Sequence, residues 1–300
     1  MSREAAFIES LRALATHPAA RNLDDDAAVL EVGGETLVLT HDMIAEGVHY
    51  LPGDPPGDVA WKLVAVNLSD LAAKGARPLG VLLGFTLGEE AWDKAFAAGL
   101  AQALTAFAIP LLGGDTVTAP ARVLGLTAIG RADGPVPSRG GARPGDLLWV
   151  SGTIGDAGAG LAALRAGDTE SPLVERYRNP RPRLEAGGRL APLVSAMMDV
   201  SDGLLIDAAR MAAASGCAIA IELDTIPLSQ GIPLEAATAG DDYELLFATR
   251  SDRAAAILAL GEEIGLPFSR IGRCAAGAGL SLSDAGEPVA LPARLGFEHG

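Results

Sequence analysis

Nine aspartates stand at or beside the ends of apolar runs, and they recur along nearly the whole chain. They are Asp25, Asp26, Asp42, Asp70, Asp115, Asp199, Asp202, Asp241 and Asp242. Because consecutive secondary-structure elements pack side by side, acids at their ends tend to converge at one rim of a domain. Carboxylates gathered there repel one another unless cations neutralise them. Mg²⁺ prefers oxygen ligands and usually binds together with a substrate's phosphates, so the pattern predicts a fold built around divalent cations.

Composition limits the possible classes of protein. The 300 residues suggest two domains of ordinary size or one large domain, and a hydrophobic content of 49% is ample for a core. The net charge of −15 argues against a protein that binds nucleic acid or a membrane surface. Apart from Lys62, Lys74 and Lys94, the strongly basic residues are arginines, which suit bidentate phosphate contacts. Cys217 and Cys274 lack metal-site spacing and are expected to be buried thiols in a reducing cytoplasm.

Two segments raise the question of a membrane or export signal. Residues 1–16 predict an amphipathic helix rather than a signal peptide, because charges are spaced through them. Its apolar face comprises Phe7, Ile8, Leu11 and Leu14. The longest uncharged stretch, residues 95–114, is long enough to cross a membrane. It is rich in alanine and breaks at Pro110, which favours a buried helix followed by a short strand.

Hydrophobic periodicity predicts a mixed α/β fold. Residues 132–146 hold four glycines and three prolines without apolar periodicity, so we place a domain boundary there. The expected domains are an N-terminal one at 1–137 and a C-terminal α/β one at 138–300; the family resemblance given below implies that the first binds ATP and Mg²⁺ and forms the dimer. In the first we expect strands at 27–32, 35–43, 79–87 and 122–130, with helices at 58–76 and 89–108. In the second we expect strands at 147–152, 196–200, 218–223 and 243–249, with helices at 204–215 and 253–265.

The segment DDDAAVL, residues 24–30, places three acids ahead of a strand. These acids either form a solvated turn or clamp a metal ion. On an extended chain Asp24 and Asp26 would share one face while Asp25 points away. Further on, Asp42 lies where a strand leaves the core.

The helix at 58–76 carries a polar face. Asn67, Asp70 and Lys74 are spaced to fall on one side of it. That side is either an exposed stripe with an Asp70–Lys74 pair or part of a site, and the apolar surroundings of Asp70 favour the site. Ahead of the helix, His49 is either a surface residue or a functional imidazole.

Two glycine-rich segments suggest phosphate contacts. LLGGDTV, residues 111–117, is an apolar strand that ends in two glycines and an acid, where the backbone can approach a phosphate closely. VSGTIGDAGAGL, residues 150–161, has the strand, turn and helix order of an anion site at a helix N-terminus. It lacks the lysine of a nucleotide P-loop. A plain turn is the alternative for residues 111–117, and residues 150–161 also lack a clean dinucleotide-binding fingerprint.

The sharpest segment is MMDVSDGLLIDAARMA, residues 197–212. Asp199 and Ser201 can share one face of a strand end, and Ser201 or Asp202 can cap a helix that starts at Leu204. The sequence shows no Ser-His-Asp order, Cys-His pair or zinc-site spacing, so no covalent nucleophile is evident. Acids for metal ions and glycines for phosphates suit phosphoryl transfer, which depends on positioning and charge neutralisation.

Taken together, eight motifs resemble the bacterial thiamine-monophosphate kinase family. That family belongs to the ATP-binding superfamily of aminoimidazole ribonucleotide synthetase and selenophosphate synthetase. The motifs, in the family's order, are DDAAVL, HDMIAEGVHY, AVNLSDLAAKGA, GGDT, SRGGARPGD, SGTIGDAGAGL, DVSDGL and GDDYELLF. The resemblance implies a two-domain aminoimidazole ribonucleotide synthetase-like fold whose N-terminal sheet pairs across a homodimer, with MgATP between the domains. It implies transfer of the ATP γ-phosphoryl group to thiamine monophosphate, giving thiamine diphosphate.

The resemblance also assigns roles to residues of this chain. It implies that several Mg²⁺ ions are held by Asp26, Thr40, His41, Asp42, Asp70, Asp115, Asp199 and Asp202. It places ATP contacts on Gly114, Asp115, Arg139 and Ser201, and substrate contacts on His49, Asp241 and Phe297. The substrate's ionised phosphate oxygen is itself the nucleophile, so no covalent nucleophile or general base is assigned.

Three positions depart from the family's pattern. Asp24 stands where glycine is usual, His41 where threonine or serine is common, and Asp241 where glutamate is common. His41 is therefore expected to ligate through its backbone carbonyl, and Asp241 reaches one methylene less far.

Two alternatives remain open. The first is another ATP-dependent synthetase of the superfamily, similar to aminoimidazole ribonucleotide synthetase. Selenophosphate synthetase is disfavoured because no cysteine precedes Cys217. The second is a non-catalytic protein that binds divalent cations. The glycine-rich turn and Arg139 argue against it, because cation storage needs neither.

Overall fold

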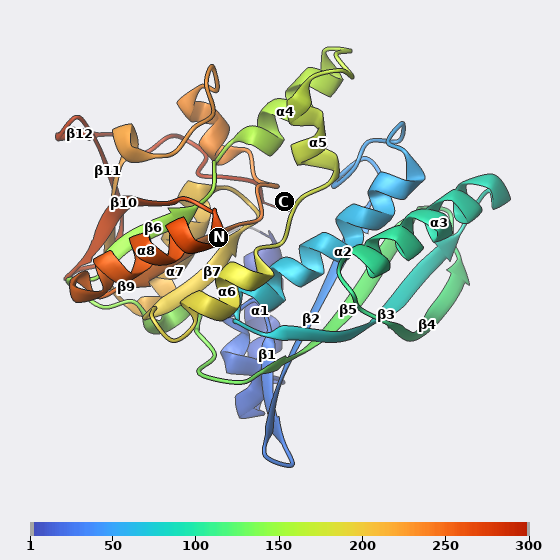
Figure 1. Ribbon diagram of the computed structural model, residues 1–300, viewed down its shortest axis with the longest axis horizontal. Helices are drawn as coiled ribbons and strands as arrows, with labels where there is room; N and C mark the ends of the chain where they lie inside the picture. The colour runs from blue at the N-terminus through green and yellow to red at the C-terminus, as the bar shows by residue number, and fades with distance from the viewer. Residues whose placement is uncertain (1–2, 299–300) are drawn as a thin grey trace.

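Two mixed β-sheets organise the molecule, one in each half of the sequence (Figure 1). The computed structural model describes residues 3–298. The first sheet, in the order β1-β2-β5-β3-β4, comprises β1 (Ala28–Val32), β2 (Glu35–Ala45), β3 (Arg77–Leu87), β4 (Leu111–Thr118) and β5 (Val123–Ala132). The second, in the order β12-β11-β8-β10-β6-β9-β7, comprises β6 (Leu147–Ser151), β7 (Ala196–Val200), β8 (Ala218–Glu222), β9 (Glu244–Thr249), β10 (Phe268–Ala275), β11 (Gly279–Asp284) and β12 (Glu287–Val289).

Helices lie against these sheets and between them. The α-helices are α1 (Arg3–Arg12), α2 (Pro56–Ala73), α3 (Glu90–Ala106), α4 (Asp156–Arg165), α5 (Pro172–Arg178), α6 (Leu184–Leu190), α7 (Leu204–Ser215) and α8 (Ala254–Ile264). Short 3₁₀ turns are η1 (Pro18–Leu23), η2 (Arg139–Gly141), η3 (Leu223–Thr225), η4 (Leu234–Thr238) and η5 (Ser251–Arg253). The mixed α/β class predicted from periodicity is confirmed.

The first sheet is covered on one face only. Strands β1 and β2 pair antiparallel around Gly33 and Gly34, whose φ angles of 60° and 86° suit a tight hairpin turn, so the predicted strand pair is confirmed. Helices α2 and α3 lie along one side of the sheet (Figure 1). Leu63 and Phe96 from these helices pack with Leu126 of β5 in the core. The opposite face, the outer face, carries exposed side chains.

The second sheet is covered on both faces. In β6, Leu148 and Val150 pack in the cluster that includes α7, whereas Trp149 packs in the cluster of α6 and α8. In β7, Met198 and Met197 divide in the same way. Because successive side chains of a strand point to opposite faces, a strand buried on both sides is apolar throughout. This explains the apolar runs at residues 147–150 of β6 and 196–198 of β7.

Helix α2 lies where the two halves meet. Every residue from Lys62 to Ala73 is buried, as expected for a helix that is apolar nearly all round. On its C-terminal turn, the Ala72 carbonyl lies so close to Gly187 of α6 that a Cβ added to Gly187 would sit 1.9 Å from that oxygen. The absence of a side chain at this one position therefore lets α6 pack directly on α2.

The helix predicted at the N-terminus is present as α1; it buries none of its residues, and Phe7 is 64% exposed. Two other expectations were wrong in detail. Helix α3 buries one face rather than its whole circumference. Strand β4 does not end at its glycines but continues through them to Thr118, paired in parallel with β3. Within residues 3–298, no helix is both long enough and apolar enough to cross a membrane. The domain boundary after residue 137 stays a prediction.

We expect Gly187→Ala to destabilise the protein, because the new methyl group must displace the Ala72 carbonyl. Overpacking of this kind costs about 1–3 kcal/mol. Thermal unfolding monitored by circular dichroism measures the effect. The matched control is Gly188→Ala on the same helix, where an added Cβ meets nothing within 4 Å and helix propensity favours alanine. Equal melting temperatures for the two variants would contradict this account of the α2–α6 contact.

Candidate functional site

Three carboxylates from three separate elements meet beside helix α2. Asp26 precedes β1, Asp70 belongs to α2 and Asp199 to β7, and each offers one oxygen within 4.8 Å of the others. Their exposed fractions are small, with Asp70 at 7% and Asp199 at 3%. The convergence of distant acids predicted from the sequence is therefore present for these three, which we call the acid cluster.

Hydroxyl groups orient two members of the acid cluster. Thr40 Oγ1 donates a hydrogen bond to Asp70 Oδ2, and Ser69 Oγ donates to Asp199 Oδ2 at 2.5 Å. Asp42 lies on the same strand as Thr40, and its backbone N–H donates to Asn67 Oδ1 at 2.9 Å. Helix α2 thus organises the site from its own polar face.

The segment around Asp26 is bent rather than extended, so the expected alternation of its acids was wrong. Asp25 and Asp26 both contact the ammonium of Lys74, which is 2.9 Å from Asp26 Oδ2. Asp24 instead turns outward to Arg12, at 2.6 Å. The exposed stripe and the Asp70–Lys74 pair are also excluded, because both side chains are buried and Lys74 pairs with the other two acids.

Arginines neutralise further acids near the acid cluster. The Arg139 guanidinium pairs with Asp26. Arg210 pairs with Asp202 and, at 2.9 Å, with Asp207. Asp207 also accepts the backbone N–H groups of residues 201 and 202 at 3.1 Å each. Neither Ser201 nor Asp202 caps helix α7, whose N-cap is Gly203, so that expectation was wrong.

The acids fall into two groups by the direction of their pKa shifts: the pKa values of Asp42, Asp70 and Asp199 are raised, and that of Asp26 is lowered. Burial, with the charges of Asp26 and Asp202, raises the pKa of Asp42 to about 6. Burial and neighbouring carboxylates also raise the pKa values of Asp70 and Asp199 well above the ordinary range. For Asp26 burial acts in the same direction, but the charges of Arg139 and Lys74 outweigh it and lower its pKa.

This division fits a cation site. Among the described residues, no lysine or arginine lies within ion-pair distance of Asp42, Asp70 or Asp199. Buried like charges without a counter-ion take up protons or bind a cation. The acid cluster supplies three carboxylate oxygens close together, and Mg²⁺ prefers oxygen ligands. These residues can therefore hold divalent ions.

A cavity of about 700 Å³ adjoins the acid cluster. Asp42, Ser201 and Asp202 line it, as do the three residues proposed for substrate, His49, Asp241 and Phe297. Apolar lining residues include Ile44, Val48 and Leu161. The volume is typical of a site for a small organic molecule. The structure therefore brings the proposed substrate residues together beside the proposed metal ligands.

Other predicted site residues lie away from the acid cluster. The His41 imidazole is on the outer face of the first sheet, with Nδ1 2.9 Å from Thr127 Oγ1. Asp115 follows Gly114 on edge strand β4, and its register through Gly84 and Gly125 to Met43 places it on the outer face as well. Three strand spacings separate Asp115 from β2, about 14 Å. Within one chain Asp115 therefore does not reach the acid cluster.

The N-terminus of helix α4 is already occupied by a side chain. Asp242 Oδ2 accepts the N–H of Gly155 at 2.8 Å, and Oδ1 accepts that of Ala157 at 3.3 Å. The glycine-rich turn therefore binds an anion, as its sequence suggested, but the anion comes from the protein itself.

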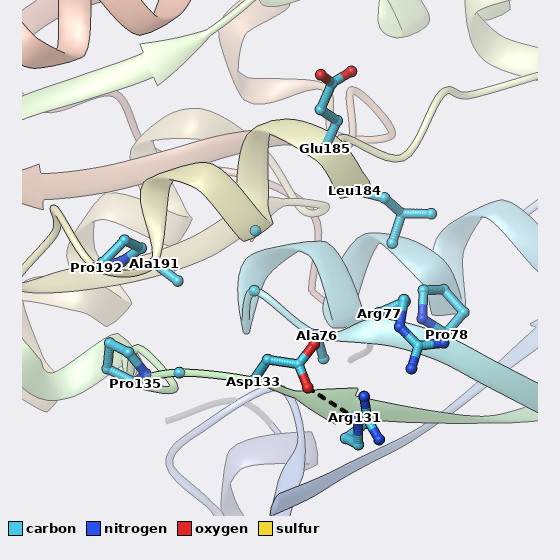
Figure 2. A pocket seen from close by; sticks show the side chains of 13 residues that line it. Ala76, Arg77, Pro78, Arg131, Asp133, Pro135, Leu184, Glu185, Ala191 and Pro192 are labelled. Atoms are coloured by element: carbon cyan, nitrogen blue, oxygen red, sulfur yellow. Dashed lines mark ion pairs between the residues drawn. The ribbon is translucent and has the colours of Figure 1, made fainter.

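A second cavity, of about 580 Å³, lies where α2 ends against α6 (Figure 2). Ala76, Arg77 and Pro78 lie on one side of it and Ala191 and Pro192 on the other (Figure 2). None of the predicted site residues lines this cavity, and it has no group of converging acids. We therefore assign the site to the cavity beside the acid cluster.

Sequence reasoning missed several residues that contribute to the site. They are Lys62, Ser69, Asp207 and Arg210. Lys62 had a signal in the sequence, since it is one of only three lysines and stands inside an apolar helix. Ser69 lies in that same apolar helix, and Asp207 and Arg210 lie in residues 197–212, but nothing in the local sequence distinguishes these three from ordinary polar helix residues.

Comparison with known proteins shows the family to which the chain belongs. Residues 24–132 match the family described as AIR synthase related protein, N-terminal domain, and residues 143–285 match the corresponding C-terminal domain. A thiamine-monophosphate kinase from Caulobacter vibrioides is 41% identical over 304 residues, covering 94% of this chain and 86% of the relative. The chain belongs to the thiamine-monophosphate kinase family. The resemblance stated from the motifs is confirmed.

Solved structures of the family share the fold. AaThiL complexed with AMPPCP and TMP superimposes with a TM-score of 0.84 at 30% identity, covering 95% of this chain and 94% of that one. The thiamine-monophosphate kinase from Stenotrophomonas maltophilia K279a gives 0.78 at 36% identity, covering 95% and 96%. The two-domain aminoimidazole ribonucleotide synthetase-like fold is thereby confirmed.

We expect Mg²⁺ to stabilise the protein more as pH rises. The raised pKa values of Asp42, Asp70 and Asp199 mean that the folded state retains protons that the unfolded chain has already lost. Without a cation, stability should therefore fall as pH rises from about 4 to beyond 6. Ionised carboxylates bind Mg²⁺ and reverse this loss. Thermal shifts at about pH 5.5 and about pH 8, with Mg²⁺ and with EDTA, measure the effect. A Mg²⁺-induced shift that was equal at both pH values would contradict this prediction.

Proposed function

We propose that the protein transfers the γ-phosphoryl group of ATP directly to thiamine monophosphate, giving thiamine diphosphate. The observation that carries this proposal is the acid cluster beside a cavity of about 700 Å³, in a member of the thiamine-monophosphate kinase family. The complex of AaThiL with AMPPCP, an ATP analogue, and TMP supports the same pair of substrates.

In this proposal the acid cluster and Asp42 hold Mg²⁺, and Thr40, the His41 carbonyl, Asp115 and Asp202 complete the ligand set. Bound Mg²⁺ would neutralise the charge of the phosphates during transfer. ATP is contacted by Gly114, Asp115, Arg139 and Ser201, and thiamine monophosphate by His49, Asp241 and Phe297. The acceptor's phosphate oxygen is already ionised near neutral pH, so neither a general base nor a covalent nucleophile is assigned.

We also propose a homodimer that buries the outer face of the first sheet. Exposed apolar side chains gather on its strands, with Met43 54%, Leu82 39% and Val117 52% exposed. A patch of this kind on one sheet face is typical of an interaction surface. Asp115 shares that face and is too far from its own acid cluster. A second copy is therefore the way in which Asp115 can meet a cation site.

The proposed location is the cytoplasm, where ATP is available and where buried Cys217 and Cys274 would stay reduced. Neither nucleic acid nor a membrane is a proposed partner. We propose that residues 1–137 form the domain that binds ATP and Mg²⁺ and dimerises, and that residues 138–300 form the second, α/β domain.

We expect Asp42→Asn to reduce turnover by on the order of 100-fold while the fold stays intact, because the variant removes one charge that faces the transferred group. A coupled ADP-release assay with thiamine monophosphate, with and without Mg²⁺, measures it. The control is Asp284→Asn, an exposed acid on β11. Near-full turnover of Asp42→Asn at saturating Mg²⁺ would show that its assignment is wrong.

The same assay separates the alternatives. ADP release with the acceptor of aminoimidazole ribonucleotide synthetase, but not with thiamine monophosphate, would favour the related synthetase. Mg²⁺ binding without ATP turnover would favour a cation-binding protein.

We expect the protein to sediment as a dimer and Leu82→Glu to sediment as a monomer with reduced turnover, because a buried carboxylate would disrupt the apolar interface. Analytical ultracentrifugation measures the mass of each. The control is Leu258→Glu, which changes a leucine that is 50% exposed on α8 of the other half. A monomeric wild type, or a dimer that Leu82→Glu leaves intact, would refute this interface.

A further inference from the structure

Lys62 is a buried charge for which the proposed chemistry has no use. Its side chain lies on α2 and is 2% exposed. The ammonium donates to the carbonyl of His49 at 2.9 Å and to Asp241 Oδ2 at 2.9 Å, and it lies 4.0 Å from the centre of the Tyr177 ring. The ammonium group of Lys62 therefore contacts a carbonyl, a carboxylate and an aromatic ring. Replacing a buried ion pair with apolar groups is often neutral or stabilising, so stability alone does not explain a lysine here.

Its partners belong to three different segments of the chain. His49 follows β2, Asp241 precedes β9, and Tyr177 lies on α5. His49 and Asp241 both line the cavity of about 700 Å³, and they are two of the three residues proposed to contact thiamine monophosphate. The Asp241 side chain is 24% exposed, so its carboxylate is only partly covered by Lys62.

The turn that carries Asp241 is conformationally strained. Asp241 and Tyr243 have φ angles of 65° and 50°, in the left-handed region that non-glycine residues rarely adopt. Their backbone N–H groups donate to Ser201 and Val200 at 2.7 and 2.8 Å, and Tyr243 Oη donates to Asp241 Oδ1 at 3.2 Å. All of these contacts lie within the C-terminal half, whereas Lys62 approaches the turn from α2.

Helix α5 has separate anchors on the first half. Arg178 Nε lies 2.9 Å from Asp54 Oδ1, and Trp61 Nε1 donates to the Pro180 carbonyl at 2.9 Å. The placement of α5 therefore does not depend on Lys62. The ion pair with Asp241 and the bond to the His49 carbonyl are the contacts that only this ammonium supplies.

We propose that Lys62 is a positioning residue that fixes Asp241 and the His49 loop as the two sides of the acceptor pocket, and so determines affinity for the acceptor rather than for MgATP. This inference rests on the proposed function and names a residue that acts through the substrate contacts. Thiamine monophosphate carries a cationic ring, and an oriented, partly exposed carboxylate is complementary to it. The acid cluster is held by other contacts, so ATP and Mg²⁺ binding stay independent of Lys62.

The test compares Lys62→Met, which keeps an unbranched side chain one atom shorter and removes its charge, with Lys62→Arg. KM for thiamine monophosphate at saturating MgATP should rise at least about tenfold in Lys62→Met, because a hydrogen-bonded charge no longer orients Asp241. KM for ATP should stay within about twofold. Lys62→Arg retains the charge and should recover part of the loss. The matched control is Lys94→Met, which removes an exposed lysine paired with Glu90 on α3.

A double variant keeps the test decisive if Lys62→Met leaves Asp241 unpaired and fails to fold. Lys62→Met combined with Asp241→Asn removes both charges of the pair together. If Lys62 acts largely through Asp241, adding Lys62→Met to Asp241→Asn should raise KM for thiamine monophosphate much less than Lys62→Met does in the wild type, with only the lost His49 contact contributing further. If the increases in KM of the two single variants multiplied in the double variant, the two residues would act separately, and the inference would be overturned.

Two further outcomes are informative in different ways. A lower melting temperature with unchanged KM in an active Lys62→Met enzyme would mean that the residue is merely structural, and would overturn this inference alone. A wild type that releases no ADP and shows no heat of binding with thiamine monophosphate would overturn the proposed function, and this inference with it.

Discussion

The fold depends on neutralising the mutual repulsion of carboxylates that both halves of the chain bring to helix α2. Asp26 and Asp70 come from the first half and Asp199 from the second, and their oxygens lie within 4.8 Å of one another. Uncompensated buried charge of this kind opposes folding. The halves can pack on α2 only because hydroxyls, resident cations and proton uptake reduce the repulsion. The same requirement makes the junction a binding site for divalent cations.

The negative charge of the site is balanced in two ways, by lysine and arginine side chains of the protein and by cations from solution. Lys74 and Arg139 neutralise Asp26, and Arg210 neutralises Asp202, so part of the charge is balanced by the chain itself. Asp70 and Asp199 are oriented by Thr40 and Ser69, which supply no charge. The remaining negative charge is available to ions from solution. Folding, protonation and cation binding are therefore linked through one set of side chains.

Much of the fold could be predicted from local patterns. The β1–β2 hairpin, helix α2 and the apolar strands of the second sheet follow from periodicity and turn residues, which act over a few positions. The family resemblance included the three acids of the acid cluster among eight predicted metal ligands, and it named His49, Asp241 and Phe297, which line the cavity. Capping of α7 by Asp202 was wrong because Arg210 and Asp207 offered stronger charged and hydrogen-bonded partners.

By itself, the sequence determined the order of strands and helices, the placement of acids at their ends and the membership of the thiamine-monophosphate kinase family. Each of these is a property of neighbouring residues or of motif order. Only the tertiary structure decided which acids share a cluster, that Lys62 and Lys74 are buried partners of carboxylates far away in sequence, and that Asp115 faces away from its own cluster. Those outcomes depend on sheet register and on which face of each strand a side chain occupies, and residues distant in the chain set both.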